Sequence, residues 1–193
     1  KAWRVGPEFP ESGYALHSAL LLSGRELDAR KLLAQLVNRF PNHAEIQVEY
    51  ATRAELSVQE QLEGLRRLGE QFPHARVVPF VKITVLSALH QLMDATKTFQ
   101  WLFSKLPSSH ELLGLGALLS LQKGETSQAQ HFAVAAVERS AHAFLGYFTQ
   151  FHLSLLKGQT SDARTILEDV LEFTSGTINE MTYVPQMWLD LGE

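Results

Sequence analysis

The chain has 193 residues, a formal net charge of −4 at pH 7 and no cysteine, with 45% hydrophobic and 20% charged residues. This length and composition are those of a folded protein with a sizeable core, and the negative charge argues against a nucleic-acid-binding surface, which needs clustered lysine and arginine. The absence of cysteine excludes a disulfide framework, a thiolate nucleophile and a cysteine-based zinc site.

Four times along the chain, at nearly even intervals, a large apolar residue stands directly before a proline. The pairs are Phe9-Pro10, Phe40-Pro41, Phe72-Pro73 and Leu106-Pro107. Proline cannot continue a helix, and it biases the residue before it away from helical angles. Each pair is therefore predicted to close the second helix of a helical hairpin, with the apolar residue as a plug before the next hairpin.

A second recurring feature is a glycine followed by a polar stretch and an alanine. Glycine ends helices because it adopts the left-handed conformation easily, and Asp, Ser or Thr shortly afterwards can cap the next helix. The small alanine lets two helices approach closely. One common interval, about 34 residues, predicts a repeat of that length. It separates Gly124, Gly158 and Gly192, and likewise Ala95, Ala129 and Ala163, with Gly24 and Ala29 as an earlier pair.

Between these marks the apolar residues have helical spacing. The stripe within 32–40 recurs within 62–72 and 166–173, and each stripe predicts an amphipathic helix. The segment 77–86 is strand-like in composition, because Val, Ile and Thr favour sheets. Its place in the repeat, with Pro79 at a first helical turn, nevertheless predicts a helix.

Both ends of the sequence are predicted to cut through a repeat. The segment 1–12 is expected to be the tail of a second helix. The segment 179–193 is expected to be a first helix that ends at Gly192 and that Pro185 kinks or shortens, so we expect the chain to be a fragment of a longer protein. No apolar run approaches the roughly 20 residues that span a bilayer; membrane insertion is therefore not expected, and a cytoplasmic location is favoured over a periplasmic one.

This repeating pattern, with its small residues and helix-ending prolines, resembles the tetratricopeptide repeat (TPR) family over essentially the whole chain. The resemblance implies an all-α fold: a right-handed α-solenoid of antiparallel helix pairs, with about five repeats and partial repeats at both ends, as one domain over residues 1–193. The second repeat departs from the pattern, because it is two residues short and has Gln61 in place of the alanine. The small position of the first helix departs in three of five repeats, so irregular crossing angles are expected; it holds His17, Ala51, Ile83, Ala117 and Phe151.

Patterns that would carry catalysis or bind a metal are few. The eight histidines form no HxxxH or HExxH pair and are scattered over different turns and helices, so a metal site is not expected. Gly114 and Gly116 lie in a segment that is predicted to be helical, and close helix packing explains them better than a phosphate-binding loop. No catalytic residue and no cofactor is therefore predicted.

The resemblance implies a binding surface on the concave face, which the first helices form. The positions that it assigns to this face in the five repeats are Tyr14, Ser18 and Leu21; Val48, Thr52 and Glu55; Phe80, Thr84 and Ser87; Gly114, Leu118 and Leu121; and Phe148, His152 and Leu155. Family members that grip a carboxyl terminus use Lys, Arg and Asn there, and this chain has none at these positions. The apolar character suits an amphipathic helix or an extended apolar peptide. The alternative for Phe80, Leu118 and Phe148 is that they are intramolecular core.

Three functions are compatible with the sequence. The leading prediction is a non-catalytic protein–protein or peptide interaction scaffold that uses the concave face, with self-association also open. The alternative is an accessory domain of a bacterial glycosyltransferase or sulfotransferase that orients the catalytic domain or its acceptor, because the segments RFPNH and FPHA are similar to those of such arrays. A third hypothesis is a sugar-binding groove that uses Tyr14, Phe80, Trp101 and Tyr147.

Overall fold

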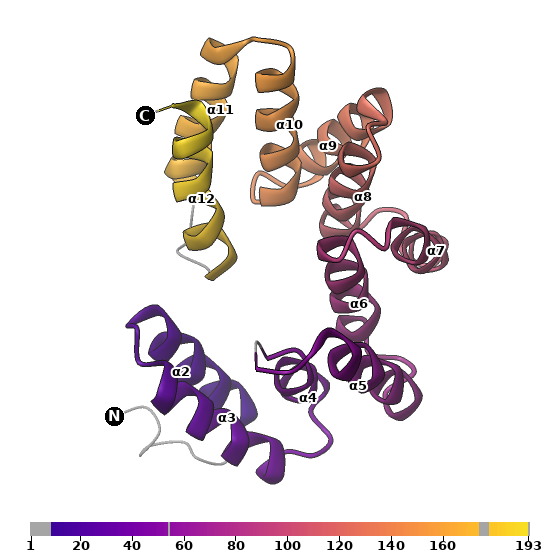
Figure 1. The fold of residues 1–193 in the computed structure, drawn as a ribbon, viewed down its shortest axis with the longest axis vertical. Helices are drawn as coiled ribbons and strands as arrows, with labels where there is room; N and C mark the ends of the chain where they lie inside the picture. The colour runs from indigo at the N-terminus through magenta and orange to yellow at the C-terminus, as the bar shows by residue number, and fades with distance from the viewer. Residues whose placement is uncertain (1–8, 54, 174–177, 193) are drawn as a thin grey trace. The chain divides into compact units, whose positions relative to one another are not determined.

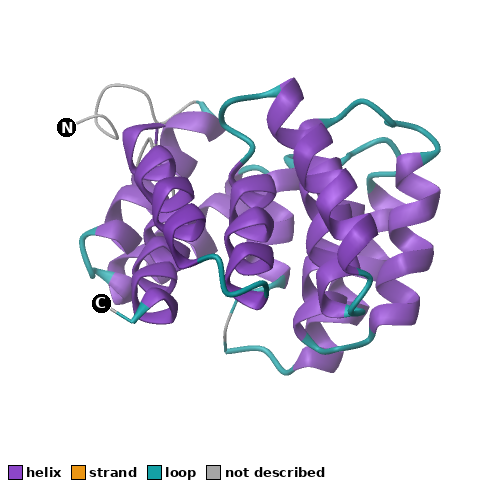
Figure 2. Cartoon of the chain, turned by 90° about the horizontal axis from the view of Figure 1, so that it is seen from above, coloured by secondary structure: helices purple, strands orange, loops and turns teal. Residues whose placement is uncertain are grey.

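The computed structural model describes residues 9–53, 55–173 and 178–192, which form helices joined by short connections (Figure 1). No strand occurs among these residues, as the colours of Figure 2 also show. The helices are α2 (Pro10–Leu22), α3 (Glu26–Arg39), α4 (Ala44–Ala51), α5 (Val58–Gln71), α6 (Val77–Ala88), α7 (Leu92–Phe103), α8 (His110–Gln122), α9 (Thr126–Arg139), α10 (Phe144–Leu156), α11 (Thr160–Phe173) and α12 (Ile178–Leu191). The predicted all-α fold is confirmed, and the strand-like segment 77–86 lies in α6.

Helices that follow one another in the sequence pack as hairpins. α2 packs against α3, α4 against α5, α8 against α9, and α10 against α11. Second helices also contact the first helix of the following pair, as α3 contacts α4, α7 contacts α8, and α9 contacts α10. The first helices α8, α10 and α12 contact one another in order. Stacked helix pairs of this kind are the organisation of helical-repeat proteins.

The chain divides into two compact units, Lys1–Lys82 and Ile83–Glu193, with the boundary inside α6. The core of the first unit joins α3 to α4 and consists of Leu32, Leu33, Leu36 and Ile46. A core of the second unit joins α10, α11 and α12 and consists of Phe144, Phe151, Ala163, Leu167, Val170 and Met187. The expectation of a single domain stays a prediction.

The small residues that mark the repeat lie where the sequence predicts. The alanines of the second helices are completely buried; they are Ala29, Ala95, Ala129 and Ala163. The turn glycines all adopt the left-handed conformation, with φ values of 71° at Gly24, 75° at Gly124, 73° at Gly158 and 88° at Gly192. The alanines are therefore buried between helices, as their small size predicts, and the glycine is confirmed as the end of a first helix.

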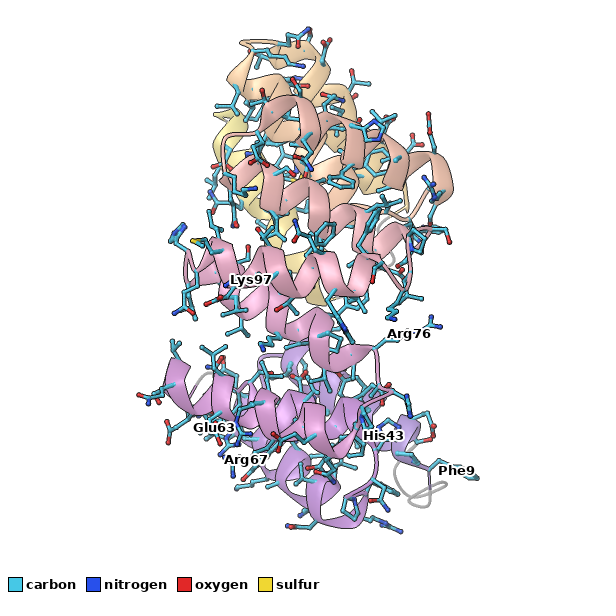
Figure 3. The ribbon with its side chains drawn as sticks, turned by 90° about the vertical axis from the view of Figure 1, so that its right-hand side faces the viewer. Phe9, His43, Glu63, Arg67, Arg76 and Lys97 are labelled. Carbon is cyan, nitrogen blue, oxygen red and sulfur yellow. The ribbon has the colours of Figure 1, made fainter. Side chains whose placement is uncertain are left out.

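The apolar residues before proline follow the prediction in part. Phe40 and Phe72 cap α3 and α5, and each backbone N–H donates to the carbonyl four residues earlier over 2.8 Å. Phe9 differs, because it precedes α2 and 61% of its surface is exposed; in Figure 3 its side chain points away from the helices. The prediction that Phe9 plugs a junction is thus wrong, since Pro10 occupies the first turn of a helix, where proline is well tolerated. The expected helix tail before it lies outside the described residues.

Pro185 does not shorten α12. The helix runs from Ile178 to Leu191, is 14 residues long, and ends at the turn glycine Gly192, as expected. Met187, two residues after the proline, is fully buried in the core of the second unit. Tertiary packing of this face therefore outweighs the hydrogen bond that proline removes.

In the second repeat, Gln61 occupies the position of the small alanine and makes contacts that alanine could not make. The Gln61 amide Nε2 lies within hydrogen-bond distance of two loop carbonyls, 3.1 Å from that of Leu56 and 3.4 Å from that of Arg53. It thus stabilises the connection from the short helix α4 to α5. The close approach of the helices has moved to Gly64, where an added Cβ would lie 3.1 Å from the Cβ of Ala51.

Gly114 and Gly116 are packing residues, as predicted. A Cβ on Gly114 would lie 2.8 Å from the Cβ of Leu145 in α10. A Cβ on Gly116 would lie 2.7 Å from Cζ of Phe99 in α7. Real Cβ atoms are not found so close to other heavy atoms, so glycine is needed at both positions for α8 to pack against its two neighbours.

Candidate protein-binding surface

In the first unit, the predicted site residue Tyr14 joins α2 to α4. Its hydroxyl donates to Glu49 Oε2 over 3.2 Å, and its ring stacks on His17 at a centroid distance of 6.1 Å. Burial, aided by the nearby Glu49 carboxylate, raises the pKa of Tyr14 to about 12. His17 itself is buried, which lowers its pKa despite the opposing effect of Glu49. The half-buried Tyr14 is therefore engaged within the unit.

The remaining predicted residues of α2, α4 and α6 differ in exposure. Val48 is only 3% exposed, so it is a core residue in this structure, and the Thr52 hydroxyl donates to its carbonyl over 2.9 Å. The residues that are at least partly exposed are Ser18 and Leu21 on α2, Thr52 after α4, and Phe80 and Thr84 on α6. The Ser87 hydroxyl is buried and donates to Gln122 Oε1.

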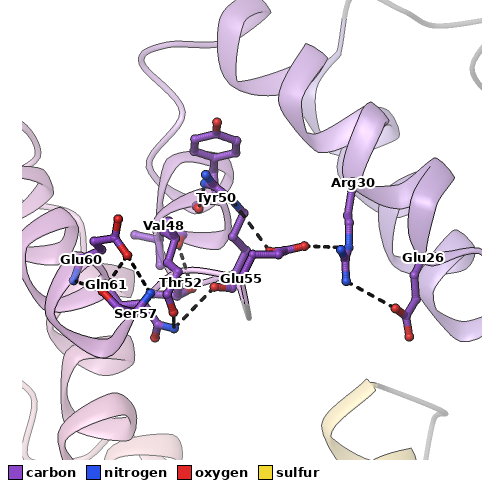
Figure 4. Close-up of polar contacts among 11 residues, drawn as sticks. Glu26, Arg30, Val48, Tyr50, Thr52, Glu55, Ser57, Glu60 and Gln61 are labelled. Carbon is purple, nitrogen blue, oxygen red and sulfur yellow. Dashed lines mark hydrogen bonds and ion pairs between the residues drawn. The ribbon is translucent and has the colours of Figure 1, made fainter.

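Glu55 belongs to a chain of charges that runs from α3 to the α4–α5 connection (Figure 4). Its carboxylate lies 2.7 Å from Nε of Arg30 and 3.9 Å from Nε of Arg53. Arg30 also pairs with Glu26 at 3.5 Å, and the Arg53 guanidinium lies 3.8 Å from the ring centroid of Tyr50. The two carboxylates and two guanidinium groups balance one another, so this network ties the helices together and offers a ligand no uncompensated charge.

In the second unit, three leucines occupy the same position in successive first helices. Leu121, Leu155 and Leu189 are each separated by one repeat period, and each carbonyl accepts a hydrogen bond from the turn glycine, over 2.9, 2.9 and 3.0 Å. Because α8, α10 and α12 contact one another in order, these residues form a row across them. Leu121 and Leu155 are half-buried, as is Leu118 one turn earlier, whereas Leu189 is 67% exposed. We call Leu121, Leu155 and Leu189 the leucine row.

Leu189 was missed by the sequence-based assignment, although a signal for it existed. The family positions were carried over for five repeats only, and α12 belongs to a sixth. Adding one repeat period to Leu155 would have identified Leu189. Gly114, in contrast, was assigned to the surface, yet it is buried against α10.

Phe148 and His152 lie where α10 meets α12. Their rings are in edge-to-face contact at 4.4 Å, and Phe148 packs against the core of the second unit. His152 Nε2 lies 3.9 Å from Asp190 Oδ2 of α12. Burial lowers the pKa of His152, although Asp190 opposes the change. The two alternatives for Phe148 are a residue of the binding surface and a residue of the core. This packing favours the core, although the side chain is only partly buried.

The aromatic residues of the sugar-groove hypothesis are divided between the two units. Tyr14 and Phe80 belong to the first unit, and Trp101 and Tyr147 to the second. Trp101 is largely exposed on α7, whereas Tyr147 of α10 packs against the core that α10 shares with α11 and α12. This hypothesis stays untested.

The stacked helix pairs define a TPR-like helical-repeat fold. Among solved structures, the chain is similar to "MamA 41-end from Desulfovibrio magneticus RS-1", with 14% identity over 93% of this chain and 95% of that chain and a TM-score of 0.54. It is also similar to "MamA RS-1 ArsTM double mutant", with 14% identity over 93% and 94% of the chains and a TM-score of 0.53. At this identity the likeness is one of fold. No family model and no curated protein matches the chain.

None of the helices that the structure describes is both long enough and apolar enough to cross a bilayer.

Proposed function

We propose that the chain is a non-catalytic interaction scaffold whose first helices bind a protein or peptide. The observation that carries the proposal is the leucine row, in which three contacting helices present an apolar residue at one repeated position. Repeated apolar positions along stacked helices suit a partner that is itself periodic, such as an amphipathic helix. The TPR-like fold supports this proposal, because helical-repeat proteins use such extended surfaces for binding.

The row has the chemistry of a binding surface in the second unit. Leu189 is mostly exposed, and Leu121, Leu155 and Leu118 are half-buried. Covering the exposed parts of such side chains with a partner's apolar atoms removes apolar surface from water, which favours a complex. Phe148 and His152 lie beside this row on α10, where their rings are in contact and His152 approaches Asp190 of α12.

Site-specific photo-crosslinking tests the proposal. A benzophenone side chain placed at Leu121 or Leu189 should crosslink a polypeptide in extracts of the source cells, which mass spectrometry then identifies. The matched controls are the exposed positions Val134 on α9 and Glu168 on α11. Crosslinking of the same products from the control positions, or none from the leucine row, would contradict a first-helix binding surface.

A further inference from the structure

The C-terminal end of α12 differs from the equivalent ends of α8 and α10. The repeat places Leu191 where those helices have a lysine at the C-cap, Lys123 and Lys157. Asp190, in the last turn, puts a carboxylate there instead. The last carbonyls of a helix carry partial negative charge, so an anion beside them is unfavourable and a cation is favourable. This end of α12 therefore lacks the cation that its counterparts have.

The contacts of Asp190 among the described residues leave its charge uncompensated. Gln186 Nε2 donates to Oδ1 over 2.7 Å, and His152 Nε2 lies 3.9 Å from Oδ2. Burial lowers the pKa of His152 and so favours its neutral form, although Asp190 opposes the change. The Asp190 side chain is 31% exposed, so a cation from another molecule can reach it.

Exposed apolar side chains lie near the C-terminal ends of both α10 and α12. Leu189 precedes Asp190 in α12, and Leu156 lies one turn after His152 in α10; the two leucines are 67% and 70% exposed. A single exposed leucine needs no explanation, but here two contacting helices each contribute one in the last turn, and Asp190 of α12 approaches α10 at His152. The sequences of α8, α10 and α12 contain no lysine or arginine. We call Leu156, Leu189 and Asp190 the Asp190 patch.

We propose that the Asp190 patch binds a polypeptide segment in which a lysine or arginine lies beside an apolar side chain. The inference rests on the proposed scaffold function and specifies the chemistry of the partner. The partner's cation pairs with Asp190 and compensates the C-terminal charge of α12, while its apolar side chain covers Leu156 and Leu189. A metal ion is the poorer occupant, because divalent cations need several ligands and the described residues hold no group of three His, Cys, Asp or Glu side chains.

Two labelled amphipathic peptides of equal length test the inference. One consists of leucine and lysine and the other of leucine and glutamate, and their binding to the full chain is measured by fluorescence anisotropy at physiological ionic strength. We expect the lysine peptide to bind roughly tenfold or more tightly than the glutamate peptide, because complementary charges favour one partner and like charges disfavour the other. Asp190→Lys should reverse this preference.

Matched variants distinguish an effect of the Asp190 patch on peptide binding from an effect of the overall charge of the chain. Glu168→Lys makes the same change of charge on the exposed face of α11, and it should leave the preference unchanged. Leu189→Ser should weaken binding of both peptides, whereas Val134→Ser on α9 should weaken neither. Thermal melting by circular dichroism must show that each variant folds as the original chain does.

Several outcomes overturn the inference. Equal binding of the two peptides does so, as does an unchanged preference in Asp190→Lys or an equal shift in Glu168→Lys. Concentration-dependent self-association that Leu189→Ser abolishes, without binding of the lysine peptide, shows that a second copy covers the patch. If the leucine row crosslinks a partner that lacks cationic residues at the contact, the scaffold function stands and this inference fails. If the row crosslinks nothing, the scaffold function itself fails.

Discussion

His90 and Gly124 occupy the same backbone position at the ends of successive first helices. Their φ values are 55° and 75°, and each N–H donates to the carbonyl three residues earlier, over 3.0 Å in His90 and 2.9 Å in Gly124. The following residues, Gln91 and Glu125, donate over 2.9 Å to the carbonyl five residues earlier in both turns. The third repeat thus makes the glycine turn of the fourth repeat with a residue whose Cβ disfavours it.

His90→Gly should stabilise the chain. The left-handed conformation costs a residue with a Cβ about 1–2 kcal/mol, whereas glycine adds about 0.5–1 kcal/mol of backbone entropy to the unfolded state. We expect a net gain of roughly 0.5–1 kcal/mol in the free energy of unfolding, measured by urea titration. Gly124→Ala, the reverse change at the equivalent turn, should destabilise. A loss of stability in His90→Gly would show that the histidine side chain makes a contact that the exposed position does not suggest.

Gly114→Ala should destabilise the second unit by about 1–3 kcal/mol, because its methyl group would overlap the Cβ of Leu145 at 2.8 Å and force α8 and α10 apart. Gly69→Ala is the control within a helix, since its Cβ would meet nothing closer than Val78 Cγ1 at 3.9 Å. It should stabilise by up to about 1 kcal/mol, because alanine is the better helix former. Equal effects of the two changes in thermal melting would contradict the packing assigned to Gly114.

Gln61→Ala restores the residue that the repeat pattern favours, yet we expect it to destabilise by about 1 kcal/mol. The change leaves the carbonyls of Arg53 and Leu56 without the amide that lies 3.4 and 3.1 Å away. Gln59→Ala, at an exposed position of the same helix, serves as the control. A gain in the urea midpoint of Gln61→Ala would mean that helix propensity outweighs these hydrogen bonds.

Stability should fall as the pH decreases below about 6.5, the ordinary pKa of histidine. Burial lowers the pKa of His17 and His152 in the folded chain, so the unfolded state binds more protons below that value and is favoured. The urea midpoint measured between pH 7.5 and 5 should decrease less steeply in His17→Gln and in His152→Gln. An unchanged slope in both variants would exclude these two residues as the cause.

At high pH, the stability of the chain should depend on the ionisation of Tyr14. Its pKa of about 12 in the folded chain exceeds the value of about 10 expected for an unfolded chain. The unfolded state therefore loses its proton first, and stability decreases as the pH rises above about 10. Tyr14→Phe removes this contribution, so its unfolding free energy should depend less on pH in this range. The same dependence in Tyr14→Phe would contradict the assignment.

The parts of the fold that could be predicted from the sequence are those in which one residue type has one physical role. Ala129 and Ala163 mark close packing, and Gly124 and Gly158 mark left-handed turns, so their period located the hairpins. The prediction failed where a different residue type takes the same structural role. His90 makes a glycine turn, and Gly64 provides the close approach that alanine provides elsewhere.

The binding surface could be predicted less well than the fold. A family position indicates which helix face a residue lies on, but burial depends on the neighbouring helix. Val48 and Gly114 are therefore enclosed, although their equivalents are partly exposed. The charge at the end of α12 depends on two differences between repeats: Leu191 replaces the lysine of the earlier first helices, and Asp190 stands where they have Gln122 and Leu156. Neither difference is part of the repeat pattern.

The glycines between α8, α9 and α10 limit how this protein can change by mutation. Gly114 faces Leu145, and a Cβ on Gly146 would lie 3.0 Å from the carbonyl oxygen of Ala133 in α9. Any larger residue at either site would widen the interaxial distance and disturb three helices together. Substitutions should therefore accumulate on the outward positions of these helices, so that the exposed surfaces can diverge among descendants while the spacing of the helices is inherited unchanged.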